Sequence, residues 1–213
     1  MKLLCANPFV AVVDDMFTVD EANHIIGLGQ EKLEKATVVN AKGGRREDAK
    51  FRSNLSAPLE TWNDEVLTNL AVKISEFVRL PPENSEPCQL LKYSGKQEYV
   101  PHPDAFEMSV GGQEQLAKGG QRLFTTLCYL NDVEAGGETE FPKLKFKVAP
   151  KLGRVLIFGN TRLGTAEAHP HSTHAGLPVK KGEKYALTFW WRQLAYHVQR
   201  EFPAESGDMR TID

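Results

Sequence analysis

Apolar residues recur at helical spacing in two stretches of the first 87 residues. The first stretch begins at Thr18, whose side chain can accept a hydrogen bond from the Glu21 amide while the Glu21 side chain reaches back to the Thr18 amide. A helix is predicted there, and its apolar stripe consists of Ala22, Ile25, Ile26 and Leu33. The second helix is predicted from about residue 63 to residue 80, where Pro81-Pro82 ends it. Its stripe consists of Val66, Leu67, Leu70, Ile74, Phe77 and Val78. Both stripes are interpreted as faces that pack on the core.

Short β-prone runs separated by Gly, Pro and Asn dominate the chain after Pro87. One earlier strand is predicted at residues 9–15, and the later strands at residues 89–93, 98–101, 123–130, 146–149, 154–158 and 185–194. In the last strand, Tyr185, Leu187, Phe189 and Trp191 face one side, and Ala186, Thr188, Trp190 and Arg192 face the other. Strands without regularly interspersed helices indicate an antiparallel barrel or a double-sheet jelly roll, with the N-terminal helices covering one sheet.

The chain shows no internal repeat and no clear boundary, so residues 1–213 are predicted to form one α+β, mainly β domain. Residues 1–87 would be a helical support region and residues 88–195 the core. Two polar, glycine-containing segments, residues 41–50 and 106–120, are predicted to be flexible loops of the kind that bind ligands or act as lids.

The composition of the chain disfavours several classes of protein. A formal net charge of −2 lacks the basic excess of a nucleic-acid-binding domain, and the basic cluster at residues 42–46 is interpreted as solvated loop charge. Three widely spaced cysteines, Cys5, Cys88 and Cys128, disfavour a disulfide framework or a zinc cluster and suggest reduced thiols. No stretch approaches the roughly 20 apolar residues of a membrane span or contains a signal-peptide core. We therefore expect a cytoplasmic protein without nucleic-acid or membrane partners.

A His-x-Asp pair, His102 and Asp104, follows a predicted strand. Residues two apart in extended backbone face the same side, so both side chains can point at one metal ion. His169, His171 and His174 are the candidates for a third ligand. Two histidines and one carboxylate form the facial triad of non-heme iron(II) oxygenases, which leaves positions open for other ligands.

The surrounding residues resemble the prolyl 4-hydroxylase family of the Fe(II)/2-oxoglutarate-dependent dioxygenases from Tyr93 to about Arg192. The matching blocks read Tyr93-x-x-x-x-x-Tyr99-x-x-His102-x-Asp104, then Arg122-x-x-Thr125-x-x-x-Tyr129-Leu130-Asn131, then Gly136-Gly137-Glu138-Thr139-x-Phe141-Pro142, and finally His174-x-Gly176-x-Pro178-Val179-x-x-Gly182-x-Lys184 and Trp190. The resemblance implies a double-stranded β-helix, or jelly-roll, barrel.

The resemblance also implies the site. His102, Asp104 and His174 would bind Fe²⁺, because the His-x-Gly-x-Pro-Val block begins at His174; His169 and His171 would lie outside the metal site. Lys184 would pair with the distal carboxylate of 2-oxoglutarate, and Tyr93, Thr139 and Trp190 would line the same pocket. O₂ would be the second co-substrate, and ascorbate is expected as the reductant.

The implied reaction is that of a procollagen-proline 4-dioxygenase: hydroxylation of a prolyl residue at C4 in a peptide or protein, with release of succinate and CO₂. Tyr99, Arg122, Glu86 and Arg52 fall where the family binds the peptide. Arg52-Ser53-Asn54 matches the family's Arg-Thr-Ser only in part, and a surface ion pair is the competing interpretation of Glu86 and Arg52.

Three alternatives stay open. The same chemistry could act on a lysyl residue, a free amino acid or another small molecule. A non-catalytic peptide-binding barrel is disfavoured because all three ligands and Lys184 are present. A nucleic-acid demethylase is disfavoured by the charge balance and by Lys184, where that group usually has an arginine.

Overall fold

The computed structural model describes residues 1–39, 42–47 and 50–196. Its α-helices are α1 (Val19–Gly29), α2 (Glu65–Val78) and α3 (Val110–Leu116), and short 3-10 turns occupy Gln30–Lys32, Thr61–Asn63 and Pro82–Asn84. The strands are β1 (Lys2–Ala6), β2 (Phe9–Val13), β3 (Glu34–Lys35), β4 (Thr37–Val39), β5 (Arg45–Glu47), β6 (Leu55–Pro58), β7 (Gln89–Ser94), β8 (Tyr99–His102), β9 (Arg122–Tyr129), β10 (Ala135–Gly136), β11 (Thr139–Phe141), β12 (Phe146–Val148), β13 (Val155–Gly159), β14 (His174–Gly176), β15 (Val179–Lys181) and β16 (Glu183–Arg192).

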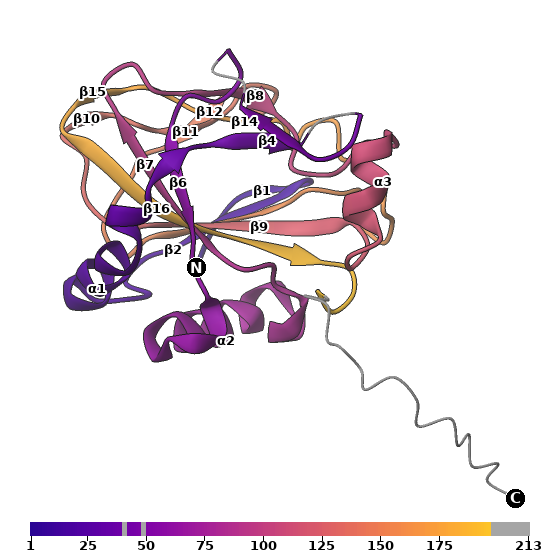
Figure 1. The fold of residues 1–213 in the computed structure, drawn as a ribbon, viewed down its shortest axis with the longest axis horizontal. Coiled ribbons are helices and arrows are strands. Elements are labelled where there is room, and N and C mark those ends of the chain that lie inside the picture. Colours follow the sequence, from indigo (N-terminus) through magenta and orange to yellow (C-terminus); the bar gives the residue numbers. More distant parts are fainter. Residues whose placement is uncertain (40–41, 48–49, 197–213) are drawn as a thin grey trace, which may run out of the picture.

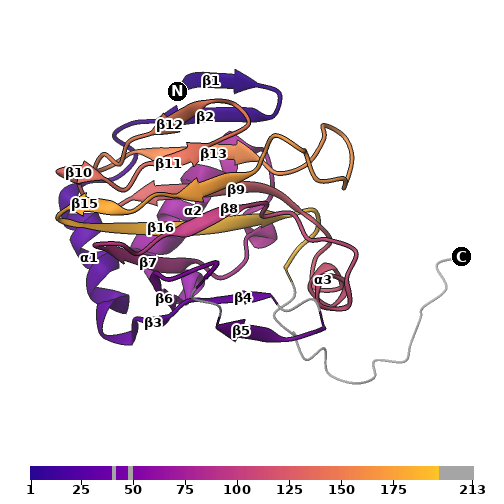
Figure 2. The same ribbon diagram turned by 90° about the horizontal axis from the view of Figure 1, so that it is seen from above.

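Two sheets face each other in the arrangement expected for a jelly roll, which confirms the predicted fold class (Figures 1 and 2). The larger sheet has the strand order β1-β2-β13-β9-β16-β7-β6-β3, and the smaller one has the order β12-β11-β14-β8. The strand pairs within both sheets are antiparallel. Helices α1 and α2 cover the face of the larger sheet that points away from the smaller sheet (Figure 1).

The two predicted helices form, with shifted ends. The Thr18 capping box is present, with Glu21 N–H donating to Thr18 Oγ1 at 3.2 Å and Thr18 N–H donating to Glu21 Oε2 at 2.7 Å. Helix α1 ends at Gly29, so the predicted stripe residue Leu33 lies beyond it. Helix α2 begins later than predicted, because the Asp64 side chain caps it by accepting from Leu67 N–H at 3.0 Å.

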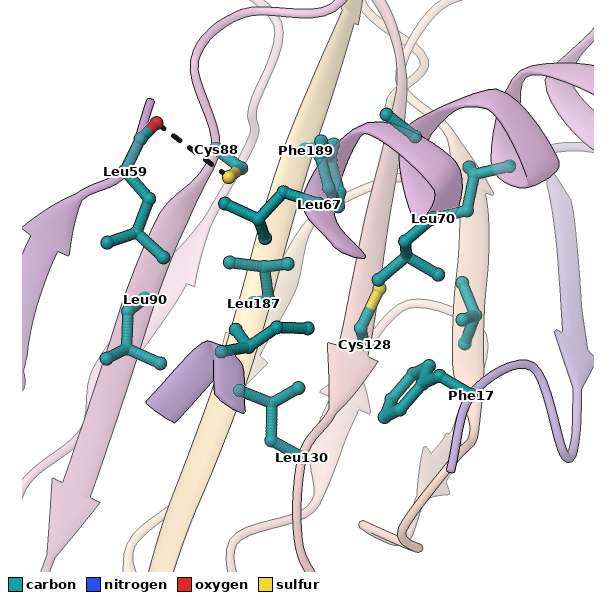
Figure 3. Close-up of a cluster of buried hydrophobic side chains, with 14 of the residues drawn as sticks. Phe17, Leu59, Leu67, Leu70, Cys88, Leu90, Cys128, Leu130, Leu187 and Phe189 are labelled. Carbon is teal, nitrogen blue, oxygen red and sulfur yellow. Dashed lines mark hydrogen bonds between the residues drawn. The ribbon is translucent and has the colours of Figure 1, made fainter. Parts of the chain in front are cut away.

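The main hydrophobic core lies between these helices and the larger sheet (Figure 3). Leu67 and Leu70 of α2 pack there against Leu187 and Phe189 of β16. Residues of β16 alternate as predicted: Leu187, Phe189 and Trp191 join this core, whereas Lys184, Thr188 and Trp190 line a cavity between the sheets. This alternation gives β16 one structural face and one face for chemistry.

The first 87 residues are not only a helical support region, which corrects that part of the prediction. Strands β1, β2, β3 and β6 extend the larger sheet on both sides, and β2 pairs with β13 from Val10 to Val13. Local patterns did not reveal most of these strands, because their stability comes from hydrogen bonds to strands far away in the chain.

The predicted loop at residues 106–120 contains helix α3. Ser109 caps it by accepting from Gly112 N–H at 3.1 Å. Gly112 is required there, because a Cβ atom at this position would lie 1.8 Å from the Glu107 carbonyl oxygen. Glycines that suggested a loop thus permit a close approach within a helix. The other predicted loop includes β5, and its residues 41, 48 and 49 lie outside the described part of the chain.

Two of the three cysteines lie in the protein interior. Cys88 and Cys128 are buried in the main core, and the Cys88 thiol donates to the Leu59 carbonyl at 3.9 Å (Figure 3). Burial raises the pKa of Cys88 to about 12, so this thiol stays protonated at neutral pH. Among the described residues, every helix is too short or too polar to cross a membrane.

Candidate active site

Strands β8 and β14 of the smaller sheet bring the three predicted metal ligands together. His102 and His174 are register partners across this strand pair, and Asp104 follows β8 by two residues. Within the described residues, one candidate ligand atom from each of His102, Asp104 and His174 lies within 4.8 Å of the other two. His102 Nε2 lies 3.6 Å from Asp104 Oδ1, and His174 Nε2 lies 3.6 Å from Asp104 Oδ2.

Both imidazoles are oriented by main-chain carbonyl groups. His102 Nδ1 lies 2.8 Å from the Val100 carbonyl oxygen, and His174 Nδ1 lies 3.0 Å from that of Ser172. A carbonyl oxygen accepts but never donates, so each Nδ1 carries the proton and donates it. With its proton on Nδ1, a neutral ring in either position presents an Nε2 lone pair toward Asp104, which is the form that binds a metal ion.

Charge and burial also favour an ionised Asp104 and a neutral His174. Burial tends to raise the pKa of Asp104, but His174, His102 and Arg122 outweigh it and hold the pKa well below its usual range. Burial lowers the pKa of His174 to about 4, so this ring is neutral at pH 7. Two imidazoles and one carboxylate, with Nε2–Oδ distances of 3.6 Å that are longer than a hydrogen bond, fit an Fe(II) facial triad.

Lys184 lies at the other end of the same cavity. It points inward from β16 with 1% of its surface exposed, and its ammonium donates to the Gly137 carbonyl at 2.8 Å. The rings of Tyr93 and Tyr129 lie 4.9 and 5.3 Å from Nζ. Burial lowers the pKa of Lys184 to about 7. No carboxylate in the described part of the chain forms an ion pair with Lys184.

This arrangement fits the distal carboxylate of 2-oxoglutarate. A buried ammonium group without an acidic partner is costly, and a bound dianion would remove that cost. Thr139 accepts a hydrogen bond from the Tyr129 hydroxyl at 2.8 Å, which leaves its own hydroxyl hydrogen available to a ligand. Tyr93 is buried against Gly176, where a Cβ would lie 3.1 Å from the Tyr93 hydroxyl. Tyr129 was not predicted as part of the site; its alternation with Leu127 and Thr125 on β9 could have indicated it.

One cavity, partly open to solvent, connects the two ends. Its lining includes nine of the eleven predicted site residues: Arg52, Tyr93, Tyr99, His102, Asp104, Thr139, His174, Lys184 and Trp190. The other two, Glu86 and Arg122, do not line it. Trp190 both lines the cavity and donates its indole N–H to Asp104 Oδ2 at 3.0 Å, so it touches the metal ligand as well as the predicted co-substrate pocket.

Tyr99 and Arg52 form the wall next to His102. The Tyr99 ring stacks on the His102 ring with centroids 3.4 Å apart and 12° between the planes. The Arg52 guanidinium lies 4.9 Å from the Tyr99 ring centroid and donates to Asn54 Oδ1 at 3.0 Å and to the Thr37 carbonyl at 3.2 Å. Arg52 is therefore buried, at 7% exposure, and is not half of a surface ion pair with Glu86.

Glu86 has a different partner. Arg122 donates to both of its oxygens, from Nε at 2.6 Å and from Nη2 at 2.9 Å, and Arg192 donates to Oε1 at 3.2 Å. All three side chains are buried. The Arg122 guanidinium also stacks on the Trp190 ring at 4.0 Å. Glu86 therefore holds Arg122 in place instead of facing the cavity, and Arg192 is a member of the network that sequence patterns did not reveal.

A second hollow lies on the outer side of the metal ligands. It is lined by Val38, Val39, Phe51, Tyr99, Phe106 and Arg122, among others, and shares His102 and Asp104 with the first cavity.

Two further histidines are not part of the metal group: His169 is buried and accepts from the His171 amide at 3.1 Å, whereas His171 is exposed. That neither histidine binds the metal stays a prediction; among the described residues, the group that could hold a metal ion contains only His102, Asp104 and His174.

Comparison with known proteins agrees with this geometry. Residues 88–192 match the 2OG-Fe(II) oxygenase superfamily. Two relatives from Arabidopsis thaliana cover most of the chain. Probable prolyl 4-hydroxylase 8 is 32% identical over 92% of this chain and 73% of its own length, and prolyl 4-hydroxylase 5 is 33% identical over 93% and 73%.

Solved structures agree as well. The viral collagen prolyl hydroxylase of Paramecium bursaria Chlorella virus 1, in its 2OG complex, is 28% identical with a TM-score of 0.69, covering 89% of this chain and 98% of that one. A prolyl hydroxylase from Trichoplax adhaerens shares the fold with a TM-score of 0.64 at 17% identity, covering 86% and 83%. The chain therefore belongs to the prolyl 4-hydroxylase family of the 2-oxoglutarate- and Fe(II)-dependent oxygenases.

Proposed function

We propose that this protein is a dioxygenase that hydroxylates prolyl residues of a peptide or protein at C4. One observation carries the proposal: a complete metal triad and a buried lysine that forms no ion pair among the described residues lie at two ends of one cavity. The relatives named as prolyl 4-hydroxylases support proline as the acceptor. A lysyl residue, a free amino acid or a non-catalytic barrel is not favoured by these comparisons.

The protein's own residues bind and orient. His102, Asp104 and His174 would hold Fe²⁺, and Lys184, Tyr93 and Thr139 would hold the distal carboxylate of 2-oxoglutarate. When bound, these groups supply the oxidising power, consuming O₂ and converting 2-oxoglutarate into succinate and CO₂. Neither histidine is placed to act as a general base, because Nδ1 of each ring is bonded to a carbonyl and Nε2 faces the metal site.

The outer hollow is the proposed path of the peptide. Tyr99 and Arg122 line it, so an aromatic face and a guanidinium would contact the proline and its flanking main chain. Arg52 would contribute from the inner wall, whereas Glu86 would act by holding Arg122.

Two segments flank this hollow and touch each other. The Gly44 amide, in the turn of the β4–β5 hairpin, donates to Glu114 Oε2 of α3 at 3.1 Å. Figure 2 shows the hairpin and α3 on the same side of the molecule. We propose that they close over the bound peptide and exclude water. Limited proteolysis tests this closure: a proline-rich peptide should slow cleavage in both segments, and unchanged cleavage would contradict it.

The activity itself is tested with proline-rich peptides, Fe²⁺, 2-oxoglutarate and air. We expect Fe²⁺-dependent succinate formation and the mass gain of one oxygen atom on proline, with 4-hydroxyproline identified after hydrolysis. Omission of Fe²⁺ and a lysine-containing peptide without proline are the controls. Turnover of the lysine peptide or of free amino acids, with none on proline, would overturn the proposed substrate.

Ascorbate and the cellular location stay predictions. Ascorbate is the proposed reductant, and its omission should shorten the time over which succinate accumulates without changing the initial rate. The proposed location is the cytoplasm, which cell fractionation with an antibody against the native protein would test.

A further inference from the structure

Asn160, which follows β13, is the start of a buried hydrogen-bond chain that ends at a metal ligand. Its side-chain amide, Nδ2, donates to Thr125 Oγ1 at 2.8 Å, and Thr125 Oγ1 lies 2.6 Å from Asp104 Oδ2. Asn160 is fully buried and Thr125 is 3% exposed. None of the sequence patterns pointed to Asn160.

The directions of these hydrogen bonds follow from the chemistry of Asp104. An ionised carboxylate only accepts, so Thr125 gives its single hydroxyl proton to Asp104 and must accept from Asn160. If the Asn160 amide were reversed, Thr125 would face two acceptors with one proton. In the orientation present, Asn160 Oδ1 has no hydrogen-bond partner among the residues that the structure describes. Leaving a buried acceptor unpaired is unfavourable, so the amide orientation serves the bond to Thr125 and not the local fold.

The main chain of Asn160 supports a second metal ligand. Its carbonyl oxygen accepts from the His169 amide at 2.9 Å, and the Ser172 hydroxyl, which donates to the His169 carbonyl at 2.8 Å, lies 3.3 Å from the same Asn160 oxygen. The Ser172 carbonyl, in turn, accepts the Nδ1 proton of His174 at 3.0 Å. Asn160 therefore reaches Asp104 through its side chain and His174 through its main chain.

We propose that Asn160 is a positioning residue of the metal centre, acting through Thr125 to fix the rotation of the Asp104 carboxylate. Thr125 and Trp190 both donate to Asp104 Oδ2. These two bonds leave Oδ1, 3.6 Å from His102 Nε2, as the oxygen with lone pairs free for the metal. Groups that orient metal ligands commonly affect metal affinity as well as activity. The inference rests on the metal site and not on the identity of the substrate.

Metal binding measured without turnover tests this role. The probe is Co²⁺, titrated into metal-free protein and followed by its visible absorption. Asn160→Leu keeps the branched shape but removes the donor, so we expect a roughly 10–100-fold weaker Co²⁺ affinity. Thermal unfolding of the metal-free protein should be unchanged or shifted upward, because the unpaired Oδ1 is removed as well. Thr125→Val should weaken Co²⁺ binding similarly, and Thr125→Ser, which keeps the hydroxyl, should restore it.

The double variant Thr125→Val/Asn160→Leu separates a relay from a general structural effect. If Asn160 acts through Thr125, the double variant binds Co²⁺ no more weakly than Thr125→Val alone. Asn84→Leu is the matched control: Asn84 is also a buried asparagine that donates to a main-chain carbonyl, that of Arg192, at 3.0 Å. It should lower the melting temperature and leave Co²⁺ affinity within about twofold, because the bond it loses goes to the Arg192 carbonyl and not to Thr125 or to a metal ligand.

Two results would overturn the relay: wild-type Co²⁺ affinity in Asn160→Leu, or losses that multiply in the double variant. Absence of Co²⁺ binding by the wild-type protein would instead overturn the metal site itself, so the two failures are distinguishable.

Discussion

Arg122 and Glu86 form a two-point ion pair in the protein interior, with Nε 2.6 Å from Oε1 and Nη2 2.9 Å from Oε2. Arg192 shares the same carboxylate at 3.2 Å. Two buried guanidinium groups therefore depend on one glutamate, and one of them stacks on Trp190, which bonds to Asp104. The pair links the outer hollow, where Arg122 lies, to the metal ligands.

Replacement of Glu86 by alanine should destabilise the fold strongly. It leaves two buried positive charges without their partner, and breaking a buried ion pair costs about 3–5 kcal/mol. Urea unfolding of the metal-free protein measures this, with Glu83→Ala, an exposed residue nearby, as control. Glu86→Gln keeps the shape and one acceptor, so it should lose less stability. Unfolding midpoints equal to the wild type in both Glu86 variants would show that the pair contributes nothing.

Replacement of Lys184 should weaken the binding of 2-oxoglutarate and not that of the peptide. Lys184→Ala removes the buried cation that faces the cavity, and a hydrogen bond to a charged group is worth enough to raise the KM for 2-oxoglutarate roughly 10–100-fold. Steady-state kinetics with each substrate varied separately measure this. Lys180→Ala, an exposed lysine on β15, is the matched control. A KM for 2-oxoglutarate that stays unchanged in Lys184→Ala would remove the lysine from the co-substrate site.

The affinity of the metal-loaded enzyme for 2-oxoglutarate should fall as the pH rises above about 7. Burial lowers the pKa of Lys184 to about 7, so the free protein loses the cation there, whereas binding of a dianion favours the protonated form. Binding above this pH should therefore take up a proton. Calorimetry in two buffers with different heats of ionisation detects that proton. Lys184→Arg, whose side chain stays charged, should bind without proton uptake, and proton uptake by this variant would contradict the assignment.

The lowered pKa of Lys184 also predicts how the stability of the fold changes with pH. The pKa of the lysine is near its usual 10.5 in the unfolded chain and about 7 in the folded one, so between these values the unfolded chain binds more protons. Stability of the metal-free protein should therefore rise with pH across this window relative to a Lys184→Met variant. Thermal unfolding at several pH values measures the difference. A difference that stays constant from pH 7 to pH 10 would mean that Lys184 does not titrate differently on folding.

His174 and His171 offer a matched test of the metal triad. His174→Ala removes a ligand atom from the group, so Fe²⁺-dependent succinate formation should fall at least about 100-fold, as expected when a ligand of the catalytic metal is lost. His171→Ala, three residues earlier and exposed, should retain activity. Treatment with a chelator should abolish activity, and added Fe²⁺ should restore it. Equal activity of the two variants would refute the assignment of His174.

Sequence patterns predicted those features that depend on neighbours in the chain. The Thr18 capping box and the alternation along β16 depend on residues a few positions apart, and both are present. Helix α3 was missed because Gly112, which suggested a loop, is needed there only where the Glu107 carbonyl approaches closely. Strand β2 was predicted, but its pairing with β13 was not, and β1, which pairs with β2, was missed because its hydrogen-bond partners are not encoded in its own residue pattern.

The sequence by itself determined the chemistry available: a His-x-Asp pair on extended backbone, and a distal histidine and a lysine located by family resemblance. Only the tertiary structure decided which side chains serve one another. Pairing of β8 with β14 places His102 beside His174, and folding places Glu86 on Arg122 and Asn160 on Thr125. Such partners are far apart in the chain, and no local spacing encodes which of two buried polar groups will satisfy the other.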